Sequence, residues 1–270
     1  MGQTMICNIC QSEMIHQFNE KILSSYSVEY LRCPNCAVLQ TEKPYWISEA
    51  YEDAIVDADT GLMQRNISLA RKVAAVIYFL FDRAGKCLDF AGGYGMFTRI
   101  MRDYGFHFYW SDPYCKNILA KGFELDDSVE PIAVLTAFEV MEHVHEPIQF
   151  LESCMQDHQV NTIIFSTQLY DGKTPDRDWW YYVFDGGQHI TFYTKQTLEV
   201  IAQKLRLYFV TANGVHLYSK KPVNPLLFRL LTGPLSYFLI VFVRLRLPSL
   251  TEKDHHRLMA LQRNNGSTLN

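Results

Sequence analysis

The sequence lacks three features that would place the protein in a particular class. The first ten residues, MGQTMICNIC, have neither a basic cluster nor a long apolar run, so we expect no secretory signal peptide. The net charge is −4, which gives no chain-wide positive surface for nucleic acid. No internal repeat or low-complexity tract is present. These absences favour a globular protein of the cytoplasm, where paired cysteines bind metal more often than they form disulfides.

The composition is that of a globular chain with enough apolar residues for a core. The chain has 270 residues, of which 48% are hydrophobic and 20% charged, so we expect one domain of about 150–200 residues with an appendage. Four segments follow from the residue types: a cysteine-bearing module at 1–43, an acidic and aromatic connector at 44–61, the main domain at 62–222, and an apolar and basic tail at 223–270.

The charges are unevenly distributed between the two ends. Residues 1–60 hold nine Asp and Glu against three Lys and Arg, whereas residues 215–270 hold two against eight. The two ends should therefore face different partners.

Four cysteines near the N-terminus form two pairs with metal-ligand spacing. Cys7 and Cys10 enclose two residues, as do Cys33 and Cys36, and 22 residues separate the pairs. Such thiolate pairs are typical of a tetrahedral structural zinc site, which leaves no open position for catalysis. The sequence therefore predicts a small zinc ribbon. A zinc ribbon can bind RNA, but the acidic balance of residues 1–60 opposes phosphate binding.

The periodicity of the main domain predicts alternating helices and strands. Apolar residues at helical spacing predict a helix over Leu62–Phe81. Strands are expected at Cys87–Phe90, Phe106–Trp110, Ala133–Ala137 and Thr162–Ser166, with helices from about Tyr94 and over Tyr114–Lys121 and Pro147–Gln156. Thr194 is expected to cap a helix, and Asn213-Gly214 to join the strands Leu207–Ala212 and Val215–Ser219 as a hairpin. The prediction is an α/β fold whose mostly parallel, Rossmann-like sheet ends in an antiparallel hairpin.

A glycine-rich turn follows the first of these strands. Asp89 ends the strand, and Ala91, Gly93 and Gly95 lead into the next helix, whose free N–H groups and close backbone suit a nucleotide ligand. Asp112 follows 23 residues later, at the end of the next strand, where a carboxylate can accept ribose hydroxyls. The dinucleotide fingerprint needs a third glycine where Thr98 stands, which disfavours NAD.

Two motifs in this order resemble the class I S-adenosylmethionine-dependent methyltransferases. The Asp89–Gly95 run is similar to their Asp-x-Gly-x-Gly-x-Gly pattern, with Ala91 in place of the first glycine. Glu139-Val140-Met141-Glu142-His143-Val144 is similar to the Glu-Val-Leu-Glu-His-Val stretch of the ubiquinone-type and sugar methyltransferases. The resemblance covers about residues 62–220. It implies S-adenosylmethionine as cofactor, bound by Asp89, Ala91, Gly93, Gly95, Asp112 and Glu139.

The acid that contacts adenine in this family is left open by the sequence. Only about twenty residues separate Asp112 from Pro131, so the usual third strand is compressed. Asp126, Asp127 and Glu130 are all candidates.

The acceptor is expected to lie near two histidines and an aromatic insertion. His143 and His189 are the candidate bases, because histidine titrates near neutral pH. The run Trp179–Tyr182 either stacks on a flat sugar or ring, or packs in the core. The resemblance favours a small-molecule acceptor, such as a sugar nucleotide or a lipid-linked glycan. A non-catalytic binding protein with this fold and an RNA methyltransferase remain alternatives.

The tail contains an apolar segment, residues 223–247, with Arg229, Arg244 and Arg246 at its margins. Its uncharged core, Leu230–Val243, has 14 residues and contains Gly233-Pro234, which is short of the roughly 20 residues of a membrane-spanning helix. The segment either lies in the interface of an anionic membrane or packs on the protein.

Overall fold

The computed structural model describes residues 5–51, 60–126, 128–129 and 131–266. They form two compact units. The first unit joins Met1–Asp59 to Ala137–Pro225, and the second joins Thr60–Thr136 to Leu226–Asn270. The cysteine-bearing residues therefore share a unit with the second half of the main domain.

A six-stranded sheet has the strand order β5-β4-β6-β7-β10-β9. The strands are β4 (Lys86–Phe90), β5 (His107–Ser111), β6 (Ile132–Phe138), β7 (Thr162–Ser166), β9 (Tyr208–Ala212) and β10 (Val215–Ser219). β4 pairs in parallel with β5 and β6, whereas β10 is antiparallel to both β7 and β9. Asn213 and Gly214 both have positive φ, as the hairpin turn requires. The predicted α/β sheet with a terminal antiparallel hairpin is confirmed.

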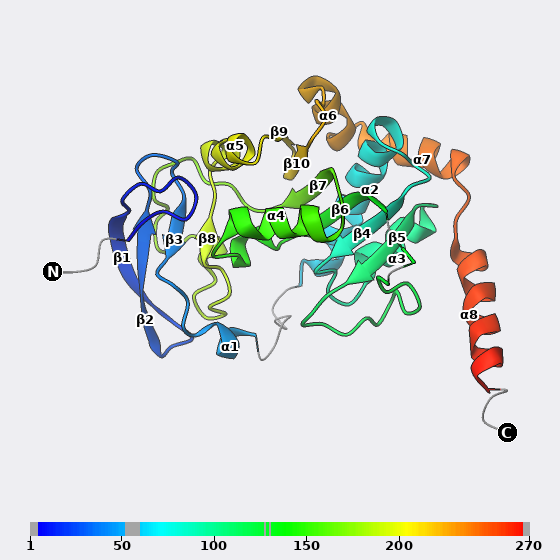
Figure 1. The fold of residues 1–270 in the computed structure, drawn as a ribbon, viewed down its shortest axis with the longest axis horizontal. Coiled ribbons are helices and arrows are strands. Elements are labelled where there is room, and N and C mark those ends of the chain that lie inside the picture. The colour runs from blue at the N-terminus through cyan, green and yellow to red at the C-terminus, as the bar shows by residue number, and fades with distance from the viewer. Residues whose placement is uncertain (1–4, 52–59, 127, 130, 267–270) are drawn as a thin grey trace. The chain divides into compact units, whose positions relative to one another are not determined.

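A second, four-stranded antiparallel sheet lies in the first unit (Figure 1). Its order is β1 (Ile15–Ile22), β2 (Tyr26–Arg32), β3 (Leu39–Thr41) and β8 (Thr191–Phe192). β1, β2 and β3 lie in the cysteine-bearing module, and β8 lies in the segment between β7 and β9. Gln40 pairs with Thr191, so this sheet joins the N-terminal residues to a segment about 150 residues later.

An aromatic core holds the first unit together. Phe18 stacks on Tyr30 with ring centroids 4.7 Å apart, and the Tyr182 ring packs edge-on against both. Tyr181 and Tyr182, in the 3₁₀ helix η2 (Trp180–Tyr182), are buried in this core, while Trp180 is 70% exposed. Two of the four aromatic residues of the insertion are therefore core residues.

The helices of the first unit are α1 (Ile47–Ala50), the 3₁₀ helix η1 (Met141–His143), α4 (Pro147–Asp157) and α5 (Lys195–Lys204). The predicted cap of α5 is present, because the Thr194 hydroxyl accepts the Thr197 N–H at 3.0 Å.

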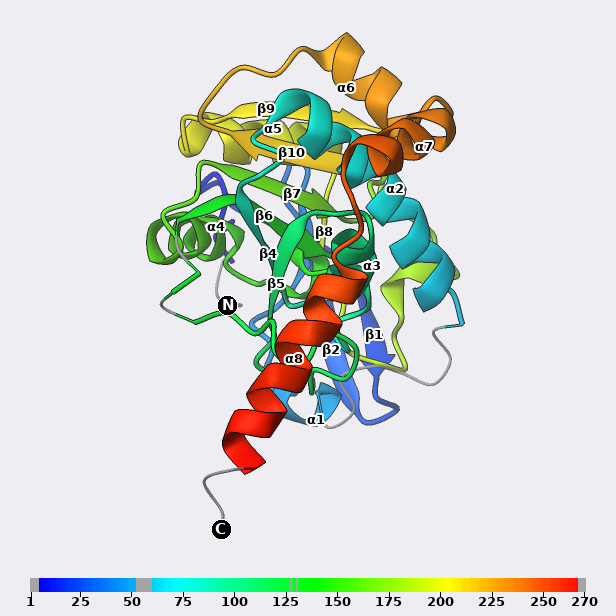
Figure 2. The same ribbon diagram turned by 90° about the vertical axis from the view of Figure 1, so that its right-hand side faces the viewer.

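The second unit contains α2 (Leu62–Leu80), α3 (Met96–Asp103), α6 (Pro225–Thr232), α7 (Ser236–Arg246) and α8 (Thr251–Gly266). α7 packs beside α2, as Figure 2 shows. Arg71 of α2 donates to the Ser236 hydroxyl at 3.0 Å, and its guanidinium lies 3.4 Å from the centroid of the Tyr237 ring. The tail therefore forms helices that pack within this unit.

The helix predicted over Tyr114–Lys121 is wrong. The segment is a series of bends, because side chains take up the backbone N–H groups that a helix needs. Asp112 Oδ1 accepts the N–H groups of Tyr114 and Cys115, both at 2.8 Å, and Asn117 Oδ1 accepts that of Ala120 at 2.9 Å.

The compressed third strand is reduced to a single parallel bridge between Trp110 and Glu124. The Trp110 N–H donates to the Phe123 carbonyl, and the Leu125 N–H donates to the Trp110 carbonyl, both at 2.8 Å. Asp126 follows in an exposed turn closed by Ser128. Asp127 and Glu130 lie outside the described residues.

α8 is attached through a buried ion pair. Asp254 is 3% exposed and accepts Arg102 Nη2 at 2.6 Å and Arg99 Nη1 at 2.9 Å. Burial acts to raise the pKa of Asp254, but the hydrogen bonds and charges of both arginines outweigh it and hold that pKa below its ordinary value. The carboxylate therefore stabilises the fold in its charged form.

We expect Asp254→Asn to lower the free energy of unfolding by about 3–5 kcal/mol at pH 7, because it leaves the buried Arg102 guanidinium without its counter-charge. Arg99 is partly exposed and keeps its ion pair with Asp103. Chemical denaturation measures the change, and the exposed Glu252→Gln on the same helix is the control. The wild-type advantage should persist above the unfolded-state pKa of about 3.9 and disappear as the pH falls through the lower folded-state pKa. If Asp254→Asn and Glu252→Gln were equally stable, the ion pair of Asp254 would not be what attaches α8.

Candidate functional site

Asp89, one residue before the end of β4, carries a buried carboxylate in the second unit. It is 2% exposed, and its two oxygens accept the hydroxyls of Thr98 at 3.0 Å and Thr136 at 3.1 Å. Burial raises the pKa of Asp89 to about 7, although both hydroxyls act in the opposite direction. The carboxyl thus ties β4 to the first turn of α3 and to β6 within this unit.

The turn between β4 and α3 is rich in glycine because the backbone there passes close to other atoms and takes positive φ angles. A Cβ on Gly92 would lie 2.7 Å from Asp89 Oδ2 and 2.8 Å from Trp110 Cδ1, so the position admits glycine alone. Gly93 and Gly95 have positive φ, and so does Ala91, at +53°. An alanine in this left-handed region is strained by about 1–2 kcal/mol, so the departure from the glycine pattern has an energetic cost.

Asp112 lies beside this turn. Its Oδ2 accepts the Gly93 N–H at 2.8 Å, and Trp110 Nε1 donates to the Gly93 carbonyl at 2.9 Å. The end of β5 therefore sets the conformation of the turn after β4. A carboxylate has about four acceptor positions. Asp112 uses three of them for backbone N–H groups, so it retains about one for a ribose hydroxyl.

Glu139 follows β6 and belongs to the first unit. Its φ is +53°, its N–H donates to the Ser166 hydroxyl at 3.1 Å, and that hydroxyl donates back to its carboxylate. The structure thus holds Glu139 against the end of β7. Its predicted contact with the cofactor stays a prediction, as do those of Asp89, Ala91, Gly93, Gly95 and Asp112.

A carboxylate and two histidines come together in the first unit. One ligand atom each of Glu142, His143 and His189 lies within 4.8 Å of the others, and the histidine rings meet edge to face at 4.9 Å. Burial, followed by the charge of Glu139, raises the pKa of Glu142 to about 8. Burial, followed by His189, lowers the pKa of His143 to about 3, so His143 is neutral at pH 7. The two predicted bases are neighbours, and a buried acid lies beside them.

The backbone around this cluster is fixed by the N-terminal sheet. The Ile190 N–H donates to the Glu142 carbonyl at 2.9 Å, and the Tyr193 hydroxyl donates to the Met141 carbonyl at 2.8 Å. Gln40 of β3 donates to the His145 carbonyl at 2.6 Å, and Asn8 donates to the same oxygen at 3.1 Å. The cysteine-bearing module therefore braces the loop that carries the cluster.

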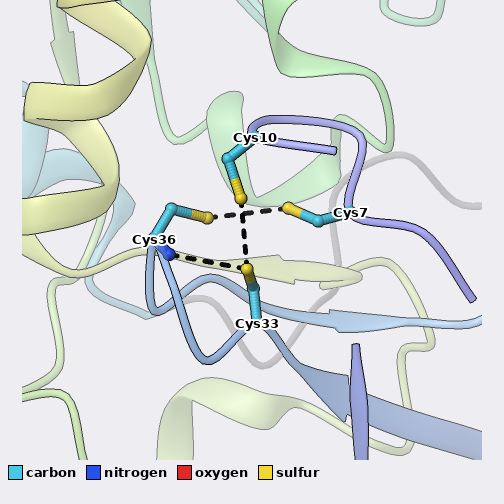
Figure 3. A group of neighbouring side chains, drawn as sticks. All are labelled: Cys7, Cys10, Cys33 and Cys36. Carbon is cyan, nitrogen blue, oxygen red and sulfur yellow. Dashed lines mark hydrogen bonds between the residues drawn. The ribbon is translucent and has the colours of Figure 1, made fainter. Parts of the chain in front are cut away.

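The four N-terminal cysteines converge as predicted (Figure 3). Cys7 Sγ lies 3.6 Å from Cys36 Sγ, Cys10 Sγ lies 3.3 Å from Cys33 Sγ, and none forms a disulfide. The hydrogen bond from Cys36 lowers the pKa of Cys7 to about 5, while the pKa of Cys36 is raised. Zn–S bonds of about 2.3 Å in a tetrahedron put sulfurs about 3.8 Å apart, so the four thiols have the spacing of a metal-ligand set.

Sequence analysis missed Gly92 and Glu142 as functional positions. Gly92 lies inside the quoted glycine run, and Glu142 lies next to His143. An acid beside a histidine was the available signal, but His189 lies 47 residues after Glu142 along the chain. Only the fold brings the three together.

A glycine turn closed by an acid on the neighbouring strand, within an α/β sheet, defines a domain that binds a nucleoside-containing cofactor. Residues 63–211 match the family described as "Methyltransferase domain". No curated protein matches the sequence. The chain belongs to this methyltransferase family, and its enzyme class is that of the S-adenosylmethionine-dependent methyltransferases.

Several solved structures are similar to this chain at low identity. Magnesium protoporphyrin IX methyltransferase from Synechocystis PCC 6803, with bound SAH, is 12% identical, has a TM-score of 0.46, and is matched over 65% of this chain and 93% of that one. An S-adenosylmethionine-dependent methyltransferase from Leishmania major is 14% identical, with a TM-score of 0.46 and coverages of 64% and 82%. The small RNA methyltransferase HEN1 is 15% identical, with a TM-score of 0.39, and this chain spans 26% of its structure and is itself covered over 57%.

We expect Asp112→Ala to weaken S-adenosylmethionine binding by about 1–3 kcal/mol, the scale of a lost hydrogen bond to a charged group. Calorimetric titration measures it. Asp112→Asn retains one acceptor oxygen for the turn, so it separates loss of the charge from collapse of the loop. Asp82→Ala is the matched control, because Asp82 also accepts a backbone N–H in an exposed turn of the same unit. Wild-type affinity in Asp112→Ala would disprove the ribose assignment.

Proposed function

We propose that the protein transfers a methyl group from S-adenosylmethionine to a small sugar-bearing acceptor, either a sugar nucleotide or a lipid-linked glycan. The observation that carries this acceptor class is an open hollow of about 430 Å³ in the first unit. Its lining residues include Tyr170 and Trp179 and the charged residues Asp171, Lys173 and Asp176. Aromatic faces stack on the apolar face of a sugar ring, and carboxylates accept its hydroxyls.

The charge of residues 1–60, the module together with most of the connector, supports a small acceptor over RNA. Residues 1–60 hold nine acidic against three basic side chains, and RNA binding depends on Lys and Arg that neutralise phosphates. An RNA acceptor is therefore the second candidate.

His189 is the group best prepared to take a proton from an acceptor hydroxyl. Its Nδ1–H donates to the Tyr181 carbonyl at 2.7 Å, an arrangement that leaves Nε2 with a lone pair. The cofactor supplies the methyl group on a sulfonium, and the displacement is in line, so the protein contributes alignment and removal of the acceptor proton.

The test is release of S-adenosylhomocysteine from purified protein with separate panels of nucleotide sugars, lipid-linked glycans and RNA. We expect release with a sugar-bearing acceptor and none with RNA alone. Asp176→Asn should raise the KM for that acceptor while cofactor affinity is unchanged, with the exposed Glu152→Gln as control. Release with RNA only would favour the second candidate. Cofactor binding without release from any panel would favour a non-catalytic binding protein.

We also propose that Cys7, Cys10, Cys33 and Cys36 bind one structural zinc ion. Three of the thiols are fully buried. Backbone N–H groups of Ile9 and Cys36 point at sulfurs of Cys7 and Cys33, both at 3.4 Å, a pattern that stabilises thiolates. A closed four-thiolate shell gives the metal a folding role.

Purified protein prepared without chelators should contain about one zinc per chain by elemental analysis. Cys33→Ser should lose most of it, because a tetrahedral site with three thiolates binds zinc far less tightly. Cys154→Ser changes a buried cysteine of α4 in the same unit and should keep its zinc. Zinc-free wild-type protein would contradict the proposal.

We further propose that α6 and α7 bind an anionic membrane surface. No single described helix is long and apolar enough to cross a membrane, but α6 and α7 together pass by length and composition, with an 85° bend between them. Large apolar side chains are exposed on both helices, including Phe238 at 74% and Leu245 at 81%. Arg229, Arg244 and Arg246 lie among them, and each basic residue near an anionic surface contributes about 1 kcal/mol.

Wild-type protein should co-float with phosphatidylserine-containing liposomes at low salt and dissociate as salt is added. The double variant Phe238→Ser, Leu245→Ser should lose at least tenfold in this binding, because both side chains are exposed and their loss leaves the packing on α2 intact. Ile118→Ser, which removes an exposed apolar side chain of the same unit that lies outside α6 and α7, is the control. Wild-type protein that ignores these liposomes at low salt would exclude the membrane contact.

A further inference from the structure

We propose that Glu142, His143 and His189 bind one divalent transition-metal ion, with open coordination positions that take oxygen atoms of the acceptor. The metal site stands on its own contacts, and only the identity of the outer ligand rests on the proposed function.

The donor set has the composition of a known kind of metal centre. Two imidazoles and one carboxylate on one side of an ion hold first-row divalent metals while leaving positions open for substrate. The three donor atoms lie within 4.8 Å of one another. Ligands at about 2.0–2.2 Å from a metal are about 3–3.5 Å apart, so a small rotation of each side chain closes the site.

The burial of Glu142 calls for a cation. The side chain has no exposed surface, and among the described residues neither carboxylate oxygen has a partner in good hydrogen-bond geometry. The hydroxyls of Tyr181 and Thr167 are its nearest donors and act to lower its pKa, but neither carries a charge to balance the carboxylate. His143 Nδ1 is likewise buried without a partner in that part of the chain. Buried polar groups are almost always satisfied, since an unpaired one costs about 1–3 kcal/mol. A metal ion satisfies the acid and the imidazole nitrogen together.

The surrounding contacts hold the ligands in place for a metal. The Tyr181 carbonyl accepts His189 Nδ1–H at 2.7 Å, which orients the ring and leaves Nε2 as the donor atom. Metal-binding histidines usually donate their second N–H in this way. The Ile190 N–H donates to the Glu142 carbonyl at 2.9 Å, so the backbone segments that carry Glu142 and His189 are bonded to each other.

The two metal-binding groups of the chain differ in chemical preference. Four thiolates select zinc, whereas imidazole and carboxylate also accept harder ions such as Mn²⁺. Mn²⁺ therefore probes the Glu142 cluster while zinc stays on the cysteines. With an ion bound, His143 and His189 would be its ligands, so the role of His189 as a base would apply only to the metal-free protein. The ion would polarise an acceptor hydroxyl and lower its pKa, which promotes loss of the proton.

The experiment titrates Mn²⁺ into zinc-containing protein and follows the free ion by electron paramagnetic resonance. We expect one Mn²⁺ per chain. Glu142→Gln and His143→Ala should each weaken binding at least tenfold, and His16→Ala, which changes an exposed histidine of the same unit, should bind as wild type does. Zinc content and circular dichroism show that each variant is folded.

Wild-type protein provides the second measurement if a variant does not fold. Its melting temperature should rise with Mn²⁺ as bound ligand stabilises the folded state. Absence of both Mn²⁺ binding and this rise, or a folded Glu142→Gln that binds Mn²⁺ like wild type, would overturn the proposal. Both measurements are independent of methyl transfer, so a failed acceptor screen leaves the metal result intact, and a failed titration leaves the screen intact.

Discussion

The backbone carbonyl of His145 joins the cysteine-bearing module to the loop after β6. It accepts the side-chain amides of Asn8 and Gln40, and Gln40 also donates to the Thr191 hydroxyl, which donates to the Val144 carbonyl at 2.7 Å. Gln40 and Thr191 are almost fully buried, so each bond lost would leave an unpaired group costing about 1–3 kcal/mol. The two short strands β3 and β8 and the loop with Glu142 and His143 are therefore one connected structure. A module that holds no reacting group still determines where the histidines stand.

Local patterns predicted the central sheet well, and the reason is visible in its burial. β7 is buried throughout and was predicted to the residue, and the Asn213-Gly214 turn located the hairpin, because both signals depend on neighbouring residues. The segment Tyr114–Lys121 has helical periodicity too, but carboxylate and amide oxygens of Asp112 and Asn117 capture its N–H groups. The spacing of apolar residues gives no sign that side-chain oxygens compete with the helix for backbone N–H groups.

The candidate sites also differ in whether neighbouring residues are enough to identify them. The glycine turn, Asp112 and the four cysteines are local motifs, and each could be identified before the structure. The partnership of Glu142 with His189 could not, because it depends on the pairing of β3 with β8 and on the aromatic core that places Tyr181 behind the histidine ring. The complete burial of the Glu142 carboxylate is likewise a property of packing, and no residue pattern encodes it.

The distance along the chain between β3 and β8 has a consequence for biosynthesis. Both cysteine pairs lie within the first 36 residues. The strand that pairs with the edge of β3 is β8, and its residue Thr191 is synthesised about 150 residues later. At about 5–20 residues per second, a ribosome needs about 8–30 s to make the intervening 150 residues. During that time the nascent module displays an open strand edge, the feature that templates unwanted pairing. The shortness of β3, at three residues, limits that exposure.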